Sequence, residues 1–198
     1  MVEYLRPIDS HVHLRWMEKK DHLHFLKLGF KHARAVGLCA VLEQGNTEPP
    51  MTDEKIINER IALVDKYRKR IYHGIHIPFT PNSTQQLEAM DLVMTLDNRI
   101  VSDKIFYVRS TGSGKIEIID TEQQRQSWTR KVANGYKGVT FQHLEDGNRF
   151  TGDFDPTSPI THSLRQNPES ELVQVERQLG FAYDAGFEGI FYIARNGH

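Results

Sequence analysis

Short apolar runs alternate with longer segments of helical periodicity along the chain. The apolar runs are rich in β-branched and aromatic residues and are bounded by glycine or proline, which is typical of strands. We predict six strands, at residues 7–12, 37–42, 71–78, 100–107, 138–141 and 189–194. Between them, apolar residues recur every three or four positions, as they do on one face of a helix. The predicted helices cover residues 21–35, 53–69, 83–96, 121–133 and 169–185.

This alternation of strands and helices predicts βαβ units and therefore an α/β fold with a parallel sheet. One segment interrupts it, because residues 144–168 are rich in Asp, Asn, Thr, Ser, Gly and Pro and show no clear period. A loop of this length is usually a functional lid or disordered, and a tolerated surface insertion is the alternative. We find no repeat and no interdomain linker, so we expect residues 1–198 to form a single domain.

Composition narrows the functional classes. The chain has 25 Lys and Arg against 26 Asp and Glu, so its net charge of −1 gives no sign of binding to nucleic acid or to an anionic membrane. No apolar run approaches the roughly 20 residues of a membrane span. The single cysteine, Cys39, excludes an intramolecular disulfide and is most simply a small core residue. We therefore expect a soluble, cytoplasmic protein.

Two histidines close the first predicted strand. His11 and His13 are two residues apart, and side chains at that spacing in an extended chain point the same way. Two imidazoles there can bind one metal ion at the strand end where parallel α/β folds place ligands. An incidental surface pair is the alternative. His73 and His76 are three apart, so they point to opposite faces and cannot form such a pair, and we expect His76 not to face the site.

The run Asp9-Ser10-His11-Val12-His13-Leu14-Arg15 resembles the first-strand motif of the amidohydrolase superfamily, and specifically of its dihydroorotase branch. Three further runs resemble motifs of this branch and follow in the same order. They are residues 43–53, where Gly45 stands in place of the usual proline, residues 141–146 and residues 161–177. Four collinear matches are far more specific than any one of them.

The resemblance implies a (β/α)8 barrel of the TIM type, incomplete here with about six βα units. It also implies a metal-dependent hydrolase that opens or closes a cyclic amide such as dihydroorotate, in pyrimidine biosynthesis, at one or two ions that are usually Zn²⁺. His11 and His13 correspond to the first-strand metal ligands, and His143 to the fifth-strand ligand. Lys104 corresponds to a lysine that is carbamylated in many relatives and bridges two metals. The neighbouring Asp103 leaves this assignment open, since some relatives use an aspartate there and others bind one metal.

The resemblance also implies a substrate with a carboxylate. Arg15 and Asn46 correspond to residues that hold this group in dihydroorotases, and the chemistry agrees. Arginine offers a planar pair of donors to a carboxylate, and asparagine adds a neutral donor. The alternatives are that Arg15 is a solvated surface residue and that Asn46 only shapes a turn.

The sequence departs from the family at its end. Where relatives carry a metal-binding histidine after the sixth strand, this chain has Arg195, which has no lone pair to offer. Strands seven and eight have no match, and the aspartate that relatives use as general base lies there, so no residue can be assigned this role. Two functions therefore stay open: a cyclic amidohydrolase, and a catalytically inactive relative that acts as a binding or assembly module.

The unmatched strands also bear on the partners of the chain. Six strands leave a barrel with two open edges, and open strand edges invite pairing unless they are covered. We expect a homo-oligomer or a partner that covers the edge, unless the chain is part of a longer gene product.

Overall fold

The computed structural model of the chain describes residues 6–14, 22–95, 99–108, 116–153, 155, 157, 158, 160, 161 and 168–193. Its strands are β1 (Ile8–Val12), β2 (Ala40–Gln44), β3 (Tyr72–Phe79), β4 (Ile100–Phe106), β5 (Val139–His143) and β6 (Ile190–Ile193). Its α-helices are α1 (His22–Ala35), α2 (Glu54–Arg68), α3 (Ser83–Thr95), α4 (Thr121–Ala133) and α6 (Pro168–Ala185), and a 3₁₀ turn, η1, covers Gly147–Arg149. Each predicted strand and helix is therefore present, with small shifts at its ends.

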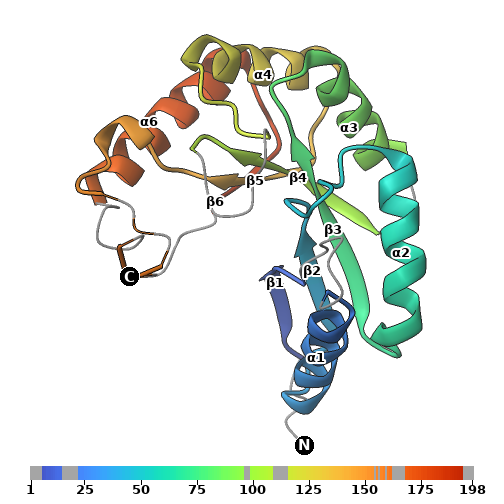
Figure 1. Ribbon diagram of the computed structural model, residues 1–198. Coiled ribbons are helices and arrows are strands. Elements are labelled where there is room, and N and C mark those ends of the chain that lie inside the picture. The colour runs from blue at the N-terminus through green and yellow to red at the C-terminus, as the bar shows by residue number, and fades with distance from the viewer. Residues whose placement is uncertain are drawn as a thin grey trace, which may run out of the picture.

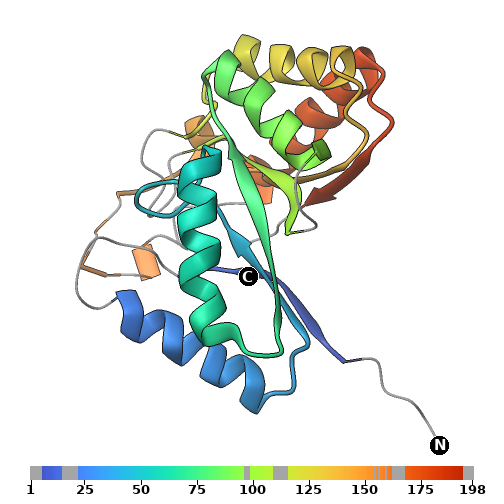
Figure 2. The same cartoon turned by 90° about the vertical axis from the view of Figure 1, so that its right-hand side faces the viewer.

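The six strands form one parallel sheet in the order β1-β2-β3-β4-β5-β6, so every strand pairs with its neighbours in the sequence. Figure 1 shows that the sheet curls and that the helices follow its outer, convex side. Seen from the side, α3, α4 and α6 gather at one end of the molecule, with α1 and α2 at the other (Figure 2). This is the start of a barrel, and it confirms the predicted incomplete (β/α)8 architecture, with six strands and five α-helices in the described residues.

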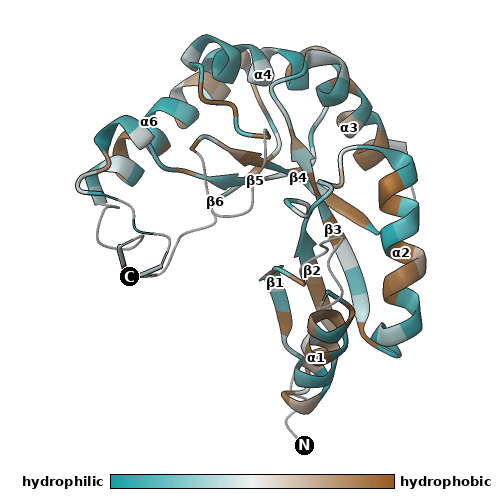
Figure 3. Ribbon diagram, viewed as in Figure 1, coloured by the Kyte–Doolittle hydropathy of each residue, from teal (hydrophilic) through white to brown (hydrophobic). Residues whose placement is uncertain are grey.

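The core lies between the sheet and its outer helices. Because side chains alternate along a strand, one set of each strand's residues faces these helices and the other set faces the concave side. Ile75, Ile77 and Phe79 of β3 are fully buried and pack in one apolar cluster with Ile57 of α2. A second cluster joins α1 to β2 and α2, and Figure 3 shows that apolar positions occur on both the strands and their helices. In the described parts of the chain, no helix combines the length and the apolar character that crossing a membrane requires.

Buried polar groups also tie the helices to the sheet. Glu43 of β2 accepts a hydrogen bond from Arg60 Nε of α2 at 2.9 Å, and its Oε2 lies 2.9 Å from His73 Nε2 of β3. All three side chains are fully buried. Although burial alone raises the pKa of Glu43, Arg60 and His73 hold it below its usual range. Glu43 is therefore a buried carboxylate that joins three consecutive elements just before the turn that carries Asn46.

The segment after β5 is only partly irregular. Leu144, Glu145 and Asp146 are buried, and η1 follows them directly. Asp146 Oδ2 accepts a hydrogen bond from Arg177 Nη2 of α6 at 2.9 Å, and its backbone N–H donates to Ser170 Oγ at 2.9 Å. Two of the family-like runs, 141–146 and 161–177, thus meet through these contacts and fasten the loop to α6.

Candidate functional site

The predicted ligands lie on the concave side of the sheet, toward the carboxyl ends of the strands. Strand register shows this directly, because residues paired across a parallel sheet face the same side. Lys104 of β4 pairs with Phe141 of β5, and His143 pairs with Phe106 of β4. His76 of β3 pairs with Ser102 of β4 in the layer below. The concave face is therefore built in layers, with Lys104 and His143 in the two layers nearest the carboxyl ends.

His11 stands at the centre of the predicted set. Its ring centroid lies 5.2 Å from that of His13, with the planes inclined by 49°. Burial lowers the pKa of His11 to about 3, and the nearby ionisable groups of Lys104, His13, His76 and His143 lower it further. The imidazole of His11 is therefore neutral at physiological pH, which leaves a lone pair for a metal ion. The same interactions show that β1, β4 and β5 bring the four predicted ligands to one region.

Lys104 is the most unusual group of the site. Its side chain is fully buried, and its Nζ has no hydrogen-bond partner. The ammonium lies 5.2 Å from the centroid of the Phe106 ring. Burial lowers the pKa of Lys104 to about 7, so a large share of the amine is neutral near neutral pH. A buried amine without a partner costs stability, and such groups are characteristic of functional sites.

The structure also decides between Lys104 and its neighbour. Asp103 points to the opposite side of β4, where it forms a buried ion pair with Lys131 of α4. Lys131 donates a second hydrogen bond, at 2.8 Å, to Thr140 Oγ1 of β5. Asp103 therefore holds helix α4 against the sheet, and Lys104 is the residue of this pair that faces the site.

His143 is held by Glu145, a carboxylate of the run 141–146 to which the sequence assigned no role. Its Nε2 lies 2.6 Å from Glu145 Oε2, and both side chains are largely buried. Within the described part of the chain, no three His, Cys, Asp or Glu side chains are arranged so that they could hold one metal ion. The strands thus gather the predicted ligands at one end of the sheet without closing them into a coordination shell. His143 and Glu145 are two residues apart, as His11 and His13 are. The rule that side chains at this spacing point the same way could therefore have predicted the contact of Glu145 with His143.

The prediction that His76 does not face the site is wrong. His76 is fully buried on the concave side, where its Nε2 lies 3.1 Å from the backbone oxygen of Ser10 and its Nδ1 2.5 Å from Ser102 Oγ. Its ring centroid is 4.1 Å from that of Phe141. The spacing rule correctly separated His76 from His73, which binds Glu43 on the helix side. It could not show that β1 would place the Ser10 carbonyl within reach.

Asn46 occupies a tight turn after β2. It is 5% exposed, and its Oδ1 is buried without a hydrogen-bond partner. The Gly45 N–H donates to the His76 carbonyl of β3 at 2.9 Å, and the Gly45 carbonyl accepts from the Met51 N–H at 3.0 Å. A Cβ at Gly45 would overlap both Pro78 and the His76 carbonyl, and a proline would lack the N–H. The proline that is usual at this place in the motif it resembles would therefore not fit this backbone position.

Other unpaired groups lie beside Asn46, and some predicted residues fall outside the description. Both amide atoms of Gln44, at the end of β2, are buried without a partner. Arg15 and Arg195 lie outside the described residues. The described part of the site therefore offers imidazoles from the three strands β1, β3 and β5, one buried amine, and the unsatisfied amide groups of Gln44 and Asn46.

No protein-family model matches the chain. The dihydroorotase of Thermococcus kodakarensis is 38% identical to it over 60 residues, which are 30% of this chain and 14% of that protein. Among solved structures, L-hydantoinase (dihydropyrimidinase) from Arthrobacter aurescens matches 93% of this chain with a TM-score of 0.68 and 17% identity. A Saccharomyces cerevisiae dihydroorotase in complex with 5-fluoroorotic acid also matches 93%, with a TM-score of 0.61 and 16% identity.

The matches differ greatly in length from this chain. It spans 40% of the hydantoinase and 46% of the yeast dihydroorotase. The fold likeness confirms the incomplete barrel, and the sequence match confirms the resemblance to dihydroorotases that the motifs predicted.

Proposed function

We propose that this chain carries the metal- and substrate-binding region of a metal-dependent hydrolase that opens or closes the C–N bond of a cyclic amide. The observation that carries the proposal is that His11 and His13, whose rings lie 5.2 Å apart, share the carboxyl end of the concave face with Lys104 and His143. They come from β1 and the residue after it, from β4 and from β5, and the motif resemblance relates them to the ligand positions of dihydroorotases. The matches to dihydroorotase and hydantoinase support the same class of reaction.

The donor set fits Zn²⁺. His11, His13 and His143 would supply nitrogen ligands, which zinc favours. The neutral amine of Lys104 can attack CO₂, forming an N–C bond and releasing a proton, and the resulting carbamate supplies anionic oxygen ligands for one ion or two. When bound, the metal would act as a Lewis acid and lower the pKa of a coordinated water. The buried, unpartnered Nζ of Lys104 supports this assignment, because modification would give the atom a role that its surroundings lack.

The protein's own groups would hold the substrate. A cyclic amide presents an N–H donor and a carbonyl acceptor, and the unsatisfied amides of Gln44 and Asn46 offer complementary groups. In dihydroorotate the ring also bears a carboxylate, for which Arg15 is the proposed partner. His76 would act as a positioning residue, since it fixes the Ser10 carbonyl beside His11. With dihydroorotate as the substrate, the reaction would belong to pyrimidine biosynthesis, and we propose that it takes place in the cytoplasm.

A second candidate is a non-catalytic binding or assembly subunit. It is favoured by the absence, among the described residues, of three metal-binding side chains around one point. Both edge strands also expose apolar residues, with Ile8 of β1 at 59%, Ile190 of β6 at 61% and Tyr192 of β6 at 42%. Contact with a second copy or another chain along these edges would cover them.

The test compares metal content and turnover. Purified wild-type protein, His11→Ala/His13→Ala and the control His24→Ala/His32→Ala, which alters two exposed histidines of α1, are analysed for bound zinc and for hydrolysis of dihydroorotate. The enzyme proposal expects zinc and turnover in the wild type and the control, and neither in the His11/His13 variant. Zinc without turnover supports the binding subunit. Equal zinc in all three proteins contradicts the metal site itself.

A further inference from the structure

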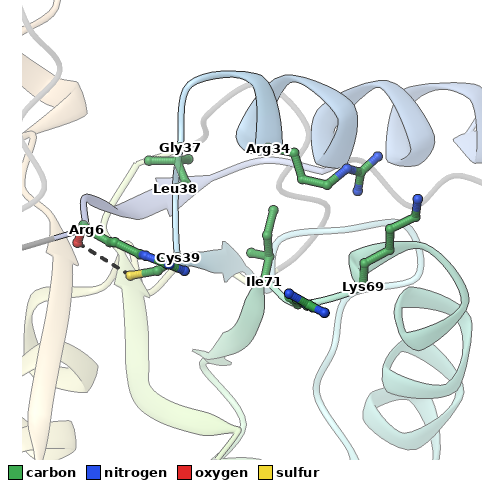
Figure 4. A pocket seen from close by; sticks show the side chains of 8 residues that line it. Arg6, Arg34, Gly37, Leu38, Cys39, Lys69 and Ile71 are labelled. Atoms are coloured by element: carbon green, nitrogen blue, oxygen red, sulfur yellow. Dashed lines mark hydrogen bonds between the residues drawn. The ribbon is translucent and has the colours of Figure 1, made fainter.

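A second pocket lies at the opposite end of the sheet. It has a volume of about 410 Å³ and opens where β2 and β3 begin, between the ends of α1 and α2. Figure 4 shows the eight residues that line it, which are Arg6, Arg34, Gly37, Leu38, Cys39, Lys69, Arg70 and Ile71. Because the strands are parallel, these amino-terminal ends are remote from the carboxyl ends that carry the candidate active site. Cys39, expected in the core, is instead half-buried in this pocket.

Four of the eight lining residues are cationic, and none is acidic. They come from three segments that are distant in the sequence: Arg6 before β1, Arg34 in the last turn of α1, and Lys69 with Arg70 after α2. None of them forms an ion pair with a described residue. Asp65, one turn before Lys69, is already engaged by Arg68 and Arg99.

The pocket combines these charges with an apolar floor. Leu38 and Ile71 form its base, and Arg34 Nη1 is fixed at the rim by donating to the Tyr67 carbonyl at 3.1 Å. Lys69 has φ 54° and ψ −114°, a conformation that L residues rarely adopt. Holding a non-glycine residue in such a region costs on the order of 1–3 kcal/mol, and such strain clusters at binding sites. The chain thus bends sharply to present Lys69 and Arg70 beside the end of α1.

The charge balance defines the ligand class. The carboxyl-terminal ends of α1 and α2 each contribute roughly half a negative charge, so about three of the four positive charges remain uncompensated. A carboxylate supplies one negative charge and a phosphate monoester roughly 1.5 to 2. A group with two linked phosphates matches the excess better than either, and arginine guanidinium pairs bind phosphate oxygens in bidentate fashion.

We propose that this pocket binds a small anion that carries a diphosphate group, either free or as the ester of a small organic molecule that rests on Leu38 and Ile71. The site is separate from the proposed hydrolase centre, so it does not depend on that function. It would give the protein a second small-molecule site at the far end of the same sheet.

The first experiment is a calorimetric titration with pyrophosphate, ADP, orthophosphate and acetate. It is done on wild-type protein and repeated on His11→Ala/His13→Ala, so that anions bound through a metal at the candidate active site are excluded. Lys69→Gln/Arg70→Gln should weaken pyrophosphate binding at least tenfold. The control Lys55→Gln/Lys66→Gln, which removes two exposed charges of α2 outside the pocket, should change it less than twofold.

Comparing the affinities for ADP and pyrophosphate distinguishes a diphosphate ester from the free anion. Tighter binding of ADP than of pyrophosphate indicates an ester, and the reverse indicates the free anion. The proposal is overturned if binding of neither pyrophosphate nor ADP saturates, if acetate binds as tightly, or if the two double variants weaken binding equally.

The second experiment needs no variant. Cys39 is the only cysteine of the chain and lines the pocket, so its rate of reaction with a thiol reagent reports on this place alone. Saturating pyrophosphate should slow labelling of Cys39 at least fivefold, whereas acetate at the same ionic strength should leave it unchanged. An unchanged labelling rate with pyrophosphate would place the anion elsewhere and refute the assignment.

Discussion

Glu43→Gln is expected to destabilise the protein strongly. The substitution keeps the size of the side chain and removes the charge that faces Arg60, whose side chain is fully buried. Two hydrogen bonds between charged groups are weakened, at about 1.5–3 kcal/mol each, which suggests a loss of about 3–6 kcal/mol. Breaking a buried ion pair by removing one partner typically costs about 3–5 kcal/mol. The two estimates agree, and we expect the free energy of unfolding to fall by about 3–5 kcal/mol.

Urea unfolding at pH 7 measures this difference, and Glu188→Gln is the matched control. Glu188 also pairs with a cation, Lys137, but both side chains are 68% exposed. Water screens such a pair, so its loss should leave the midpoint unchanged within error. A Glu43→Gln variant that unfolds within 1 kcal/mol of the wild type would show that the buried pair is not a net contributor, and the reasoning would be wrong.

The same comparison has a defined dependence on pH. Because Arg60 and His73 hold the pKa of Glu43 below its usual range despite burial, the folded state keeps the carboxylate charged where the unfolded chain takes up a proton. The stabilising contribution is therefore complete above the unfolded pKa of about 4.3 and is lost as the pH falls through the folded pKa. The gap between wild type and Glu43→Gln should stay constant from pH 7 to about pH 5 and shrink below that. A gap that widens in acid would contradict the assignment.

Three further predictions concern the site. Lys104→Met should raise the free energy of unfolding of the metal-free protein by about 1–3 kcal/mol in urea, because an apolar side chain replaces a buried amine without a partner. The same variant should contain less zinc by elemental analysis. Gly45→Ala should cost about 1–3 kcal/mol in urea unfolding because its Cβ overlaps Pro78, whereas Gly180→Ala on the open surface of α6 should be neutral or stabilising. His76→Ala should weaken zinc binding by roughly 10–100-fold in a chelator competition, as loss of a group that orients a ligand strand does; unchanged affinity would leave His76 with a packing role.

The fold was predictable because its signals are local. Each βα unit carries its own periodicity, so the six strands and five helices could be placed one at a time. The largest error is at β2, predicted at 37–42 and observed at Ala40–Gln44. Gly37 has φ 77° and belongs to the turn that ends α1, whereas the polar Glu43 and Gln44 extend the strand. Glu43 is tolerated there only because Arg60 and His73 compensate its charge, and no local pattern reveals these partners.

The site was predictable only as far as spacing reaches. Two-residue alternation indicated His11 and His13 as candidate ligands, and the family resemblance indicated Lys104 and His143. The position of His76 depends on how β1 and β4 lie beside β3, which is a tertiary fact. Which of Lys104 and Asp103 faces the site is also set by tertiary contacts, because the ion pair with Lys131 holds Asp103 on the helix side of β4.

The basic pocket could not be predicted from the sequence. A net charge of −1 averages over the whole chain and gave no reason to expect an anion site. Yet a parallel sheet brings every strand start to one end, and here that places Arg6, Arg34 and Lys69 around one cavity, although 28 and 35 residues separate them in turn. The same topology collects neutral nitrogen donors at the other end. The cations lie at the starts of the parallel strands and the nitrogen donors at their carboxyl ends. A variant that removes the cations should therefore leave zinc binding at His11 unchanged. A change in zinc affinity would show that the strands couple the two ends.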